Sequence, residues 1–463
     1  MTLLQFLRQA RQVHLQFLKG SLTEPPIYVL GNPSADLDSI ISAIVFSYCA
    51  NNRLPYATPR PHVPLLNLPS VPAGSELYRL RPEFITALWL VTNFPALKPD
   101  EQFENSLKSA GKLLSEHIVT ISDFAQSLKE PSTPNELSVD SILVDWNALP
   151  ERTEGQPGRG SLSGLSKLSF QVVGCIDHHI DENFISGCRD LPQGQPVIIQ
   201  PGPGSCTSLI ANEMRKRELW TAITGSSDEL VQVTKLALAA ILIDTSNLTA
   251  KGKVTFEDEE AVNFLHRQVQ NADPEWDMEA FYEKVLAAKN NSLDLLTLDE
   301  VLDRDFKDWT ETTCSSGQRV KLGFCSSVKP IRWLVQKAGG PQQLLDGVRS
   351  FAVAEGRKLD VVVVMTSFTS KAGEFVRELL ICAPNGDDVV VCGIESFITR
   401  AGPELDLVDW SALDGELVDV EDEKIRSSLN GHSDLWRRLW IQKNTTASRK
   451  QVAPLLRTAF AQL

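Results

Sequence analysis

The sequence lacks an apolar stretch long enough to cross a membrane. Of its 463 residues 42% are hydrophobic, but no run of about 18 or more apolar residues occurs, so we expect neither a transmembrane helix nor a membrane partner. A Cys-x-x-Cys pair is also missing, although the chain has eight cysteines. Their scatter argues against a zinc ribbon and a disulfide framework and indicates a reducing compartment, so we expect a cytoplasmic protein.

Positive charge is scarce. The chain has 45 Lys and Arg residues against 59 Asp and Glu residues, which gives a formal net charge of −14. A protein that binds duplex nucleic acid usually presents a basic face, so this balance disfavours nucleic acid as a partner. It does not exclude a small anionic substrate, because bound metal ions and a few placed cations can reverse the local field. The length predicts two or three domains.

Histidine is scarce too, with seven residues in the whole chain. Two of them, His178 and His179, are adjacent and directly follow Asp177. The apolar segment at 170–173 predicts a buried strand in front of them. A histidine pair alone is equally compatible with a solvated loop, so its interpretation depends on acidic residues elsewhere in the chain.

Acidic residues follow three other apolar segments, each of which we interpret as a strand. Ligands of doubly wound α/β sheets bind at the carboxyl ends of strands, so we expect these carboxylates to meet the histidines at one edge of a sheet. Carboxylates with one or two imidazoles suit Mn²⁺ or Mg²⁺, and a pair of such ions suits hydrolysis of phosphoanhydrides or phosphodiesters. The acidic residues are Asp36 and Asp38 after residues 27–31, Asp145 after residues 141–144, and Asp244 after residues 239–243.

Other segments lead to further structural expectations. The Gly/Ser-rich stretch at 155–166 predicts a mobile surface loop. Residues 207–218 predict a helix whose start is capped by a hydroxyl side chain or binds a phosphate. Residues 378–382 and 389–392 predict the two strands of a hairpin.

Four motifs together resemble those of the DHH phosphoesterase superfamily, and they occur in the same order. They are Asn32–Ser39, Leu143–Asp145, Asp177–His179 and Ile243–Thr245. The C-terminal half resembles the DHHA2 domain of one branch, which contains family II inorganic pyrophosphatases, cytosolic exopolyphosphatases of the yeast type and prune-like proteins. The resemblance covers roughly residues 25–460, and its motifs are specific in combination and weak singly.

The resemblance implies an α/β fold in two domains. Residues 1–290 would form a DHH domain that binds metal and carries catalysis, with a mainly parallel sheet flanked by helices. Residues 291–463 would form a smaller α/β DHHA2 domain that binds substrate. The change in sequence character near residue 290 fits this division.

The resemblance also implies the residues of the site. It implies two divalent ions, Mn²⁺ or Mg²⁺ with Co²⁺ as a further option, bound by Asp36, Asp38, Asp145, His178 and Asp244. It implies that Asp145 bridges the ions, that Asp38 and His179 join it in catalysis, and that the substrate is bound by Asn32, His179, Lys307, Arg449 and Lys450.

Missing histidines indicate the branch. Asn32 stands where family II pyrophosphatases usually have histidine, and Trp146 stands where they have the histidine of Asp-His-Asn. Prune-like proteins share the asparagine but have arginine where this chain has His179. Because an amide is a poorer ligand than imidazole, we expect weaker metal binding and ready use of Mg²⁺.

The sequence therefore predicts an exopolyphosphatase that removes terminal orthophosphate from linear inorganic polyphosphate with water activated by two metals. Short phosphoanhydrides are the other expected substrates, which would make the chain a pyrophosphatase or a nucleoside polyphosphate hydrolase. A prune-like regulatory protein that binds without catalysis, and a nucleic-acid exonuclease, are the remaining alternatives.

Overall fold

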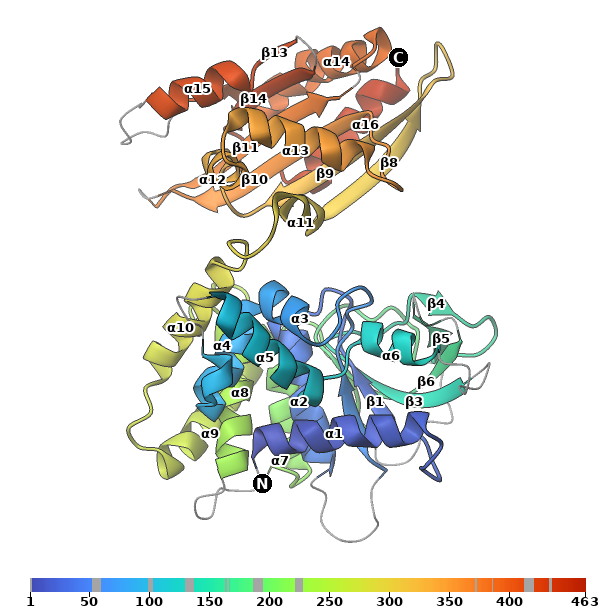
Figure 1. The fold of residues 1–463 in the computed structure, drawn as a ribbon, viewed down its shortest axis with the longest axis vertical. Coiled ribbons are helices and arrows are strands. Elements are labelled where there is room, and N and C mark those ends of the chain that lie inside the picture. Colours follow the sequence, from blue (N-terminus) through green and yellow to red (C-terminus); the bar gives the residue numbers. More distant parts are fainter. Residues whose placement is uncertain are drawn as a thin grey trace. The chain divides into compact units, whose positions relative to one another are not determined.

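The structure, a computed structural model, forms two compact units, Met1–Leu295 and Leu296–Leu463 (Figure 1). The expected division after residue 290 lies close to this boundary. Each unit is described by itself below. The structure describes residues 2–51, 60–98, 103–129, 137–162, 165, 167–185, 195–220, 228–370, 373–384, 386–411, 420–432 and 435–463.

The first unit is built on a mainly parallel sheet. Its strands are β1 (Ile27–Leu30), β2 (His62–Leu65), β3 (Leu137–Val144), β4 (Glu151–Arg152), β5 (Arg159–Ser161), β6 (Leu168–Asp177) and β7 (Val197–Ile199). Their order is β2-β1-β3-β6-β5-β4, with β7 beside β6. The pairs among β1, β2, β3, β6 and β7 are parallel, whereas β4 and β5 pair antiparallel. The predicted α/β fold is confirmed.

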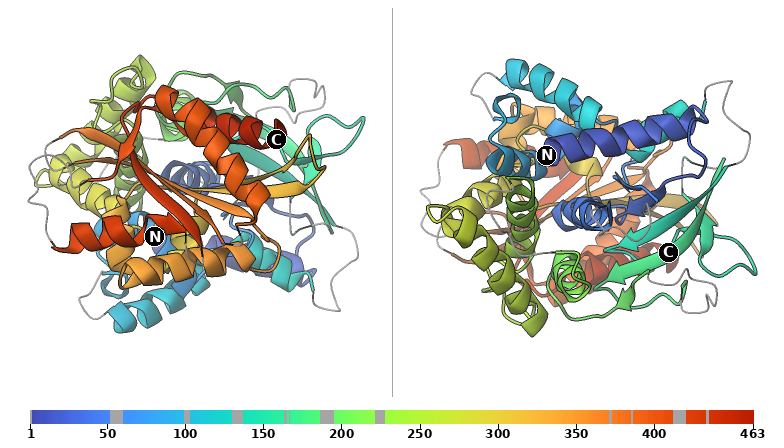
Figure 2. Two further views of the ribbon diagram at one scale, coloured as in Figure 1. Left: turned by 90° about the horizontal axis from the view of Figure 1, so that it is seen from above. Right: turned by 90° about the horizontal axis from the view of Figure 1, so that it is seen from below.

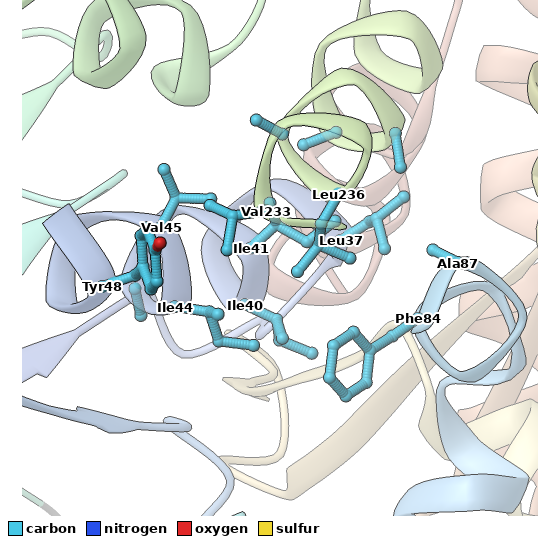
Figure 3. Packing of buried hydrophobic residues seen from close by; sticks show 14 of the residues in the cluster. Leu37, Ile40, Ile41, Ile44, Val45, Tyr48, Phe84, Ala87, Val233 and Leu236 are labelled. Atoms are coloured by element: carbon cyan, nitrogen blue, oxygen red, sulfur yellow. The ribbon is translucent and has the colours of Figure 1, made fainter. Parts of the chain in front are cut away.

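Helices cover both faces of this sheet (Figures 1 and 2). The apolar residues of α2 are buried all around, and Figure 3 shows Ile41 beside Val233 of one neighbouring helix and Ile40 on the side of Phe84 of another. The helices are α1 (Leu3–Leu18), α2 (Leu37–Asn51), α3 (Ser75–Leu80), α4 (Pro82–Thr92), η1 (Pro95–Leu97), α5 (Phe103–His117), α6 (Ile121–Ser127), α7 (Cys206–Lys216), α8 (Asp228–Asp244), α9 (Phe256–Ala272) and α10 (Met278–Asn290).

Three neighbouring strands end at the same level of the sheet. Leu30 of β1 pairs with Leu143 of β3, which in turn pairs with Cys175 of β6, all in parallel register. The segments that follow these strands therefore start side by side. This places three of the four sequence motifs at one edge of the sheet.

The second unit has a mixed, mostly antiparallel sheet of order β12-β14-β11-β10-β9-β8, with β13 beside β14. Its strands are β8 (Phe306–Thr312), β9 (Arg319–Ser327), β10 (Val361–Thr369), β11 (Phe375–Ala383), β12 (Leu407–Asp409), β13 (Gly431–His432) and β14 (Trp436–Gln442). Its helices are α11 (Leu298–Asp303), α12 (Ile331–Ala338), α13 (Pro341–Val353), α14 (Asp388–Leu405), α15 (Val420–Ser428) and α16 (Arg449–Ala461).

Asp244 does not follow a strand, as the sequence predicted, but ends helix α8. The run that precedes it is apolar because this helix is buried on several sides, with Leu236–Leu242 fully covered. A short apolar run has no periodicity that separates a buried strand from a buried helix. The fourth motif therefore reaches the edge of the sheet from a helix.

The predicted hairpin is wrong in its second half. β11 is a strand, but residues 388–405 form α14. The carboxylate of Asp387 accepts a hydrogen bond from the amide of Val390 at 2.8 Å and so caps the helix. Val390, Ile394 and Phe397 then recur at helical spacing and pack in the core of the unit. This burial outweighs the strand preference of the three consecutive valines.

The stretch at 155–166 is not simply a loop. Its residues 159–161 form β5, which pairs antiparallel with both β4 and β6. Residues 163, 164 and 166 lie outside the described residues.

Candidate metal centre

One carboxylate and two imidazoles gather at the carboxyl ends of β3 and β6. Asp145 directly follows β3, and His178 and His179 directly follow β6. Ligand atoms of these three residues all lie within 4.8 Å of one another. Nε2 of His178 is 3.0 Å from Oδ1 of Asp145, and Nδ1 of His179 is 3.7 Å from the same oxygen. Parallel register thus brings together side chains that lie more than 30 residues apart in sequence.

A backbone carbonyl orients His178. Its Nδ1 lies 2.7 Å from the carbonyl oxygen of Pro203. Because a carbonyl can only accept, Nδ1 donates, and the neutral ring keeps its lone pair on Nε2, facing Asp145. Burial alone would lower the pKa of His178, but the hydrogen bond with Asp145 and the charges of Asp38 and Asp145 raise it to about 10. Nε2 of His178 and Oδ1 of Asp145 can therefore share either a proton or a metal ion.

The other oxygen of Asp145 is held by the first motif. Oδ2 accepts hydrogen bonds from Nδ2 of Asn32 and from Oγ of Ser39, both at 2.8 Å. Ser39 Oγ in turn accepts the backbone N–H of Asn32 at 2.8 Å. This contact needs glycine at position 31, since a Cβ there would lie 2.8 Å from Ser39 Oγ. Asp145 is 2% exposed and therefore fixed in place, with Oδ1 directed at the histidines.

Asp38 accepts four hydrogen bonds from the start of α7. Its carboxylate accepts from Oγ of Ser205 at 2.8 Å, from N of Cys206 at 2.6 Å, and from N and Oγ1 of Thr207 at 3.1 and 2.6 Å. The anion at this helix start is thus a side chain of α2, where the sequence left open a cap or a phosphate. In this arrangement Asp38 contributes negative charge beside the cluster.

Two further predicted ligands, Asp36 and Asp244, do not belong to the cluster of Asp145, His178 and His179. Asp36 is exposed and caps α2, accepting the backbone N–H of Ser39 at 3.0 Å. Burial and the charge of Asp38 raise the pKa of Asp244 to about 8, against the opposing charge of Lys289, whose Nζ is 3.8 Å away. The same two causes raise the pKa of Asp145 to about 7. These carboxylates repel one another and favour a cation among them.

His179 is oriented by the aspartate in front of it. Its Nδ1 donates to Oδ1 of Asp177 at 2.8 Å, and Asn147 Nδ2 donates to the other oxygen at 2.5 Å. Asp177 is fully buried, whereas the side chain of His179 is 56% exposed. Its hydrogen bond with Asp177 raises the pKa of His179. His179 thus presents its remaining nitrogen to the solvent.

These donors fit a divalent cation. Buried carboxylate and a neutral imidazole with a fixed tautomer are the ligands that Mn²⁺, Mg²⁺ and related ions take in proteins. Asp38, Asp145 and Asp244 repel one another, and a bound cation would relieve this repulsion. The number and identity of the ions do not follow from the donors.

Two of the three predicted phosphate-binding residues of the second unit, Lys307 and Arg449, line a pocket of about 470 Å³. Lys307 lies on β8 and is exposed, and Arg449 begins α16. Arg449 donates to the backbone oxygen of Asp305 at 2.6 Å and to its Oδ1 at 2.7 Å. Lys450 follows in α16, but its side chain lies outside the described part of the chain.

Sequence reasoning missed several polar residues of both regions. Ser39 and Asn147 hold the carboxylates of Asp145 and Asp177. Ser39 is the last residue of the first motif, and Asn147 lies two residues after the second. Arg377 and Arg457 line the pocket of the second unit. Neither arginine belongs to a recognisable motif, and only the pairing of β11 with β10 and the packing of α16 place them there.

Comparisons with known proteins agree with the sequence motifs. Residues 283–459 match the family model of the DHHA2 domain. The match covers most of the second unit. The predicted resemblance to proteins of this branch is thereby confirmed. No helix among the described residues has the length and apolar character needed to span a membrane.

Two curated proteins align with nearly the whole chain. A Schizosaccharomyces pombe protein named "Putative exopolyphosphatase" is 28% identical over 94% of this chain and 91% of its own length. A Bos taurus protein named "Exopolyphosphatase PRUNE1" is 25% identical over 97% of this chain and 79% of its own length. The similarity therefore extends through the region in front of the DHHA2 domain as well.

Two solved structures also match along most of the chain. A "putative family II inorganic pyrophosphatase" of Methanococcus jannaschii has a TM-score of 0.39 and 18% identity, covering 94% of this chain and 99% of its own. An exopolyphosphatase-related protein of Bacteroides fragilis has a TM-score of 0.35 and 13% identity, covering 98% and 96%.

Proposed function

We propose that this protein is an exopolyphosphatase, which hydrolyses the terminal phosphoanhydride bond of linear inorganic polyphosphate. The observation that carries the proposal is the cluster of Asp145, His178 and His179, with ligand atoms within 4.8 Å, in a chain that also has a DHHA2 domain. The similarity to two proteins named as exopolyphosphatases supports it.

The proposed centre binds divalent cations through Asp145 and His178, with Asp36, Asp38 and Asp244 as the further proposed ligands. Such ions neutralise charge on phosphoryl oxygens and acidify water. We assign two ions, Mg²⁺ or Mn²⁺, as the working form. Asn32 and Ser39 keep Asp145 in one orientation, and Pro203 keeps the lone pair of His178 directed at it.

His179 faces the substrate in this proposal. Its protonated form, which the hydrogen bond with Asp177 favours, donates to a phosphoryl oxygen or to the leaving phosphate. Lys307, Arg449 and Lys450 are the proposed phosphate-binding residues of the DHHA2 domain. An arginine can contact two phosphate oxygens at once, whereas a lysine acts as a point charge.

A cytoplasmic location is part of the same proposal. It is supported by the scattered cysteines, which indicate a reducing compartment.

Phosphate release by the purified chain tests this function. Long-chain polyphosphate, tripolyphosphate, pyrophosphate and a nucleoside tetraphosphate are compared with Mg²⁺, Mn²⁺, Co²⁺ or no metal. We expect long-chain polyphosphate to be a good substrate, to lose phosphate from its ends, and to require a divalent metal. Pyrophosphate as the best substrate by a wide margin would instead identify a pyrophosphatase, and metal-independent turnover would refute the centre.

Asp145→Asn is the variant that tests the centre. The variant keeps the shape of the side chain but removes its charge. We expect kcat to fall by at least about 100-fold, because a metal centre lowers the activation free energy by several kcal/mol. The matched control is Asp140→Asn on the same strand, where Asp140 pairs with Arg60 away from the cluster. Circular dichroism checks that both variants fold. Unchanged turnover in Asp145→Asn would sink the assignment of this cluster.

A further inference from the structure

The pocket of the second unit is lined by a row of four cationic side chains. They are Lys307, Arg377, Arg449 and Arg457, and we call them the cationic row. Lys307 comes from β8, Arg377 from β11, and the other two from α16. Asp305 is the one acidic residue among those that line the pocket. The excess of positive charge in a chain with a net charge of −14 points to an anionic ligand.

The sheet register spaces the row widely. Lys307 pairs with Phe324 on β9, which pairs with Val363 on β10, which pairs with Ile381 on β11. Arg377 lies four residues further along β11. Three strand intervals and four residues place the backbones of Lys307 and Arg377 roughly 20 Å apart. Ser367 and Arg377 are cross-strand partners, and both line the pocket.

Two members of the row are paired with carboxylates. Arg449 pairs with Asp305 at 2.7 Å, and Arg457 pairs with Glu311 at 2.5 Å. Within the described residues no carboxylate pairs with Lys307 or Arg377. Nε of Arg377 donates to the carbonyl of Thr445 at 2.7 Å, which orients the guanidinium and leaves its terminal amino groups for a ligand. Burial lowers the pKa of Arg377, with no neighbouring acid to offset it.

We propose that the cationic row binds several phosphates of one extended polyphosphate, and that Arg377 is the residue that selects long chains. A tripolyphosphate has only three phosphates. When Lys307 of β8 and Arg449, which pairs with Asp305 in front of β8, bind them, we expect Arg377, three strands away on β11, to be left without a phosphate. A longer chain extends along the row and gives Arg377 a phosphate to bind in its forked geometry. The selection for long chains rests on the proposed exopolyphosphatase function, whereas binding by the row does not.

Kinetics of Arg377→Gln test the selection. A hydrogen bond to a charged group contributes about 1.5–3 kcal/mol, so the ratio of kcat/KM for long-chain polyphosphate to that for tripolyphosphate is expected to fall by about tenfold or more. The effect lies in KM for the long chain, because Arg377 contacts no reacting atom. Arg377→Lys keeps the charge and recovers part of the ratio. An unchanged ratio in Arg377→Gln overturns the proposal.

A matched control separates binding from packing. Arg438 of β14 lies over the ring of Trp440 at 5.2 Å, as Arg377 lies over the ring of Phe375 at 5.1 Å, but Arg438 does not line the pocket. We expect Arg438→Gln to leave the ratio at its original value. If Arg377→Gln lowers kcat/KM for both substrates equally, the residue acts by holding Thr445 in place, and the proposal is wrong.

Equilibrium binding distinguishes this inference from the proposed function. Fluorescently labelled long-chain polyphosphate is titrated with the full chain and with Arg377→Gln, without turnover and at two salt concentrations. Weaker binding by the variant supports the row even if the chain hydrolyses no phosphoanhydride. Equal binding by both forms overturns it. Single-stranded DNA is the competitor, and if DNA binds as tightly and with the same dependence on Arg377, the row recognises nucleic acid instead.

Discussion

At the scale of single residues, Asp145 uses its two oxygens differently. Oδ1 faces the histidines, and Oδ2 accepts hydrogen bonds from Asn32 and Ser39. Asn32 is itself committed, since its Oδ1 accepts the backbone N–H of Ser34 at 2.9 Å while its amide nitrogen donates to Asp145. The asparagine that the sequence assigned to substrate therefore orients a carboxylate in this structure. Its role toward substrate stays a prediction.

Ser39→Ala is expected to weaken metal use without removing a ligand. It takes a donor from Asp145 and leaves the partly buried N–H of Asn32 without its acceptor. Loss of such supporting contacts typically costs 10–100-fold in metal affinity, so we expect about a tenfold higher metal concentration for half-maximal activity. Activity measured against Mg²⁺ and Mn²⁺ concentration checks this.

Ser47→Ala is the control for that prediction. Ser47 lies on the same helix and is equally buried, but its hydroxyl has no hydrogen-bond partner among the described residues. The metal dependence of this variant should match that of the original chain. If the metal concentration for half-maximal activity rises equally in both variants, α2 is sensitive to the loss of any serine, and Ser39 has no specific role in orienting Asp145.

At the scale of elements, α1 is joined to the sheet by a buried histidine. His14 is 2% exposed, and its Nδ1 lies 2.8 Å from the hydroxyl of Tyr28 on β1. Burial, with a smaller effect from the charge of Arg11, lowers the pKa of His14 from 6.5 to about 3. The unfolded chain therefore binds a proton between these values that the folded chain does not. This contribution to stability is complete above the unfolded pKa and is lost as the pH falls.

His14→Gln should make the free energy of unfolding less dependent on pH. Between about pH 7 and about pH 5 the original chain should lose about 2 kcal/mol more than the variant, because glutamine can bond Tyr28 but does not titrate. Urea denaturation at both pH values measures this difference. His432→Gln is the control, since His432 is exposed. Equal pH dependence of the original chain and His14→Gln would contradict the prediction.

Elements also show where sequence reasoning succeeded. The order of a buried strand, a polar turn and an apolar helix predicted β1 and α2, because burial on both sides leaves an uninterrupted apolar run. The same logic failed at Asp244 and at residues 389–392, where apolar residues belong to helices α8 and α14. Burial removes the polar residues whose spacing would distinguish the two structures.

At the scale of the whole molecule, each unit has a core of its own. Phe324, Phe397 and Phe460 are fully buried in the second unit, in one cluster with residues of β10, β11 and α16. A domain with its own core folds alone. We expect residues 296–463, expressed separately, to unfold in urea in one cooperative transition. In that fragment Phe397→Ala should cost about 3–5 kcal/mol, which verifies a native core.

A fragment without near-ultraviolet circular dichroism or a cooperative transition would contradict this independence. The sequence could predict that the ends of β1, β3 and β6 lie at one edge of a sheet, because ligands of doubly wound sheets bind at the carboxyl ends of strands. It could not predict the cationic row. Arg377 reaches the pocket through the antiparallel pairing of β11 with β10, and that register depends on residues spread along both strands.

The backbone at Asp145 also limits how this position can change during evolution. Its φ of 55° lies in the left-handed region, where glycine is unstrained and asparagine and aspartate are tolerated better than other residues. A lineage that lost hydrolysis but kept the fold as a binding protein would be drawn to Asn or Gly here, and not to Val or Ile. We therefore expect the residue at this one position to separate relatives that bind metal at the proposed centre from those that only keep the scaffold.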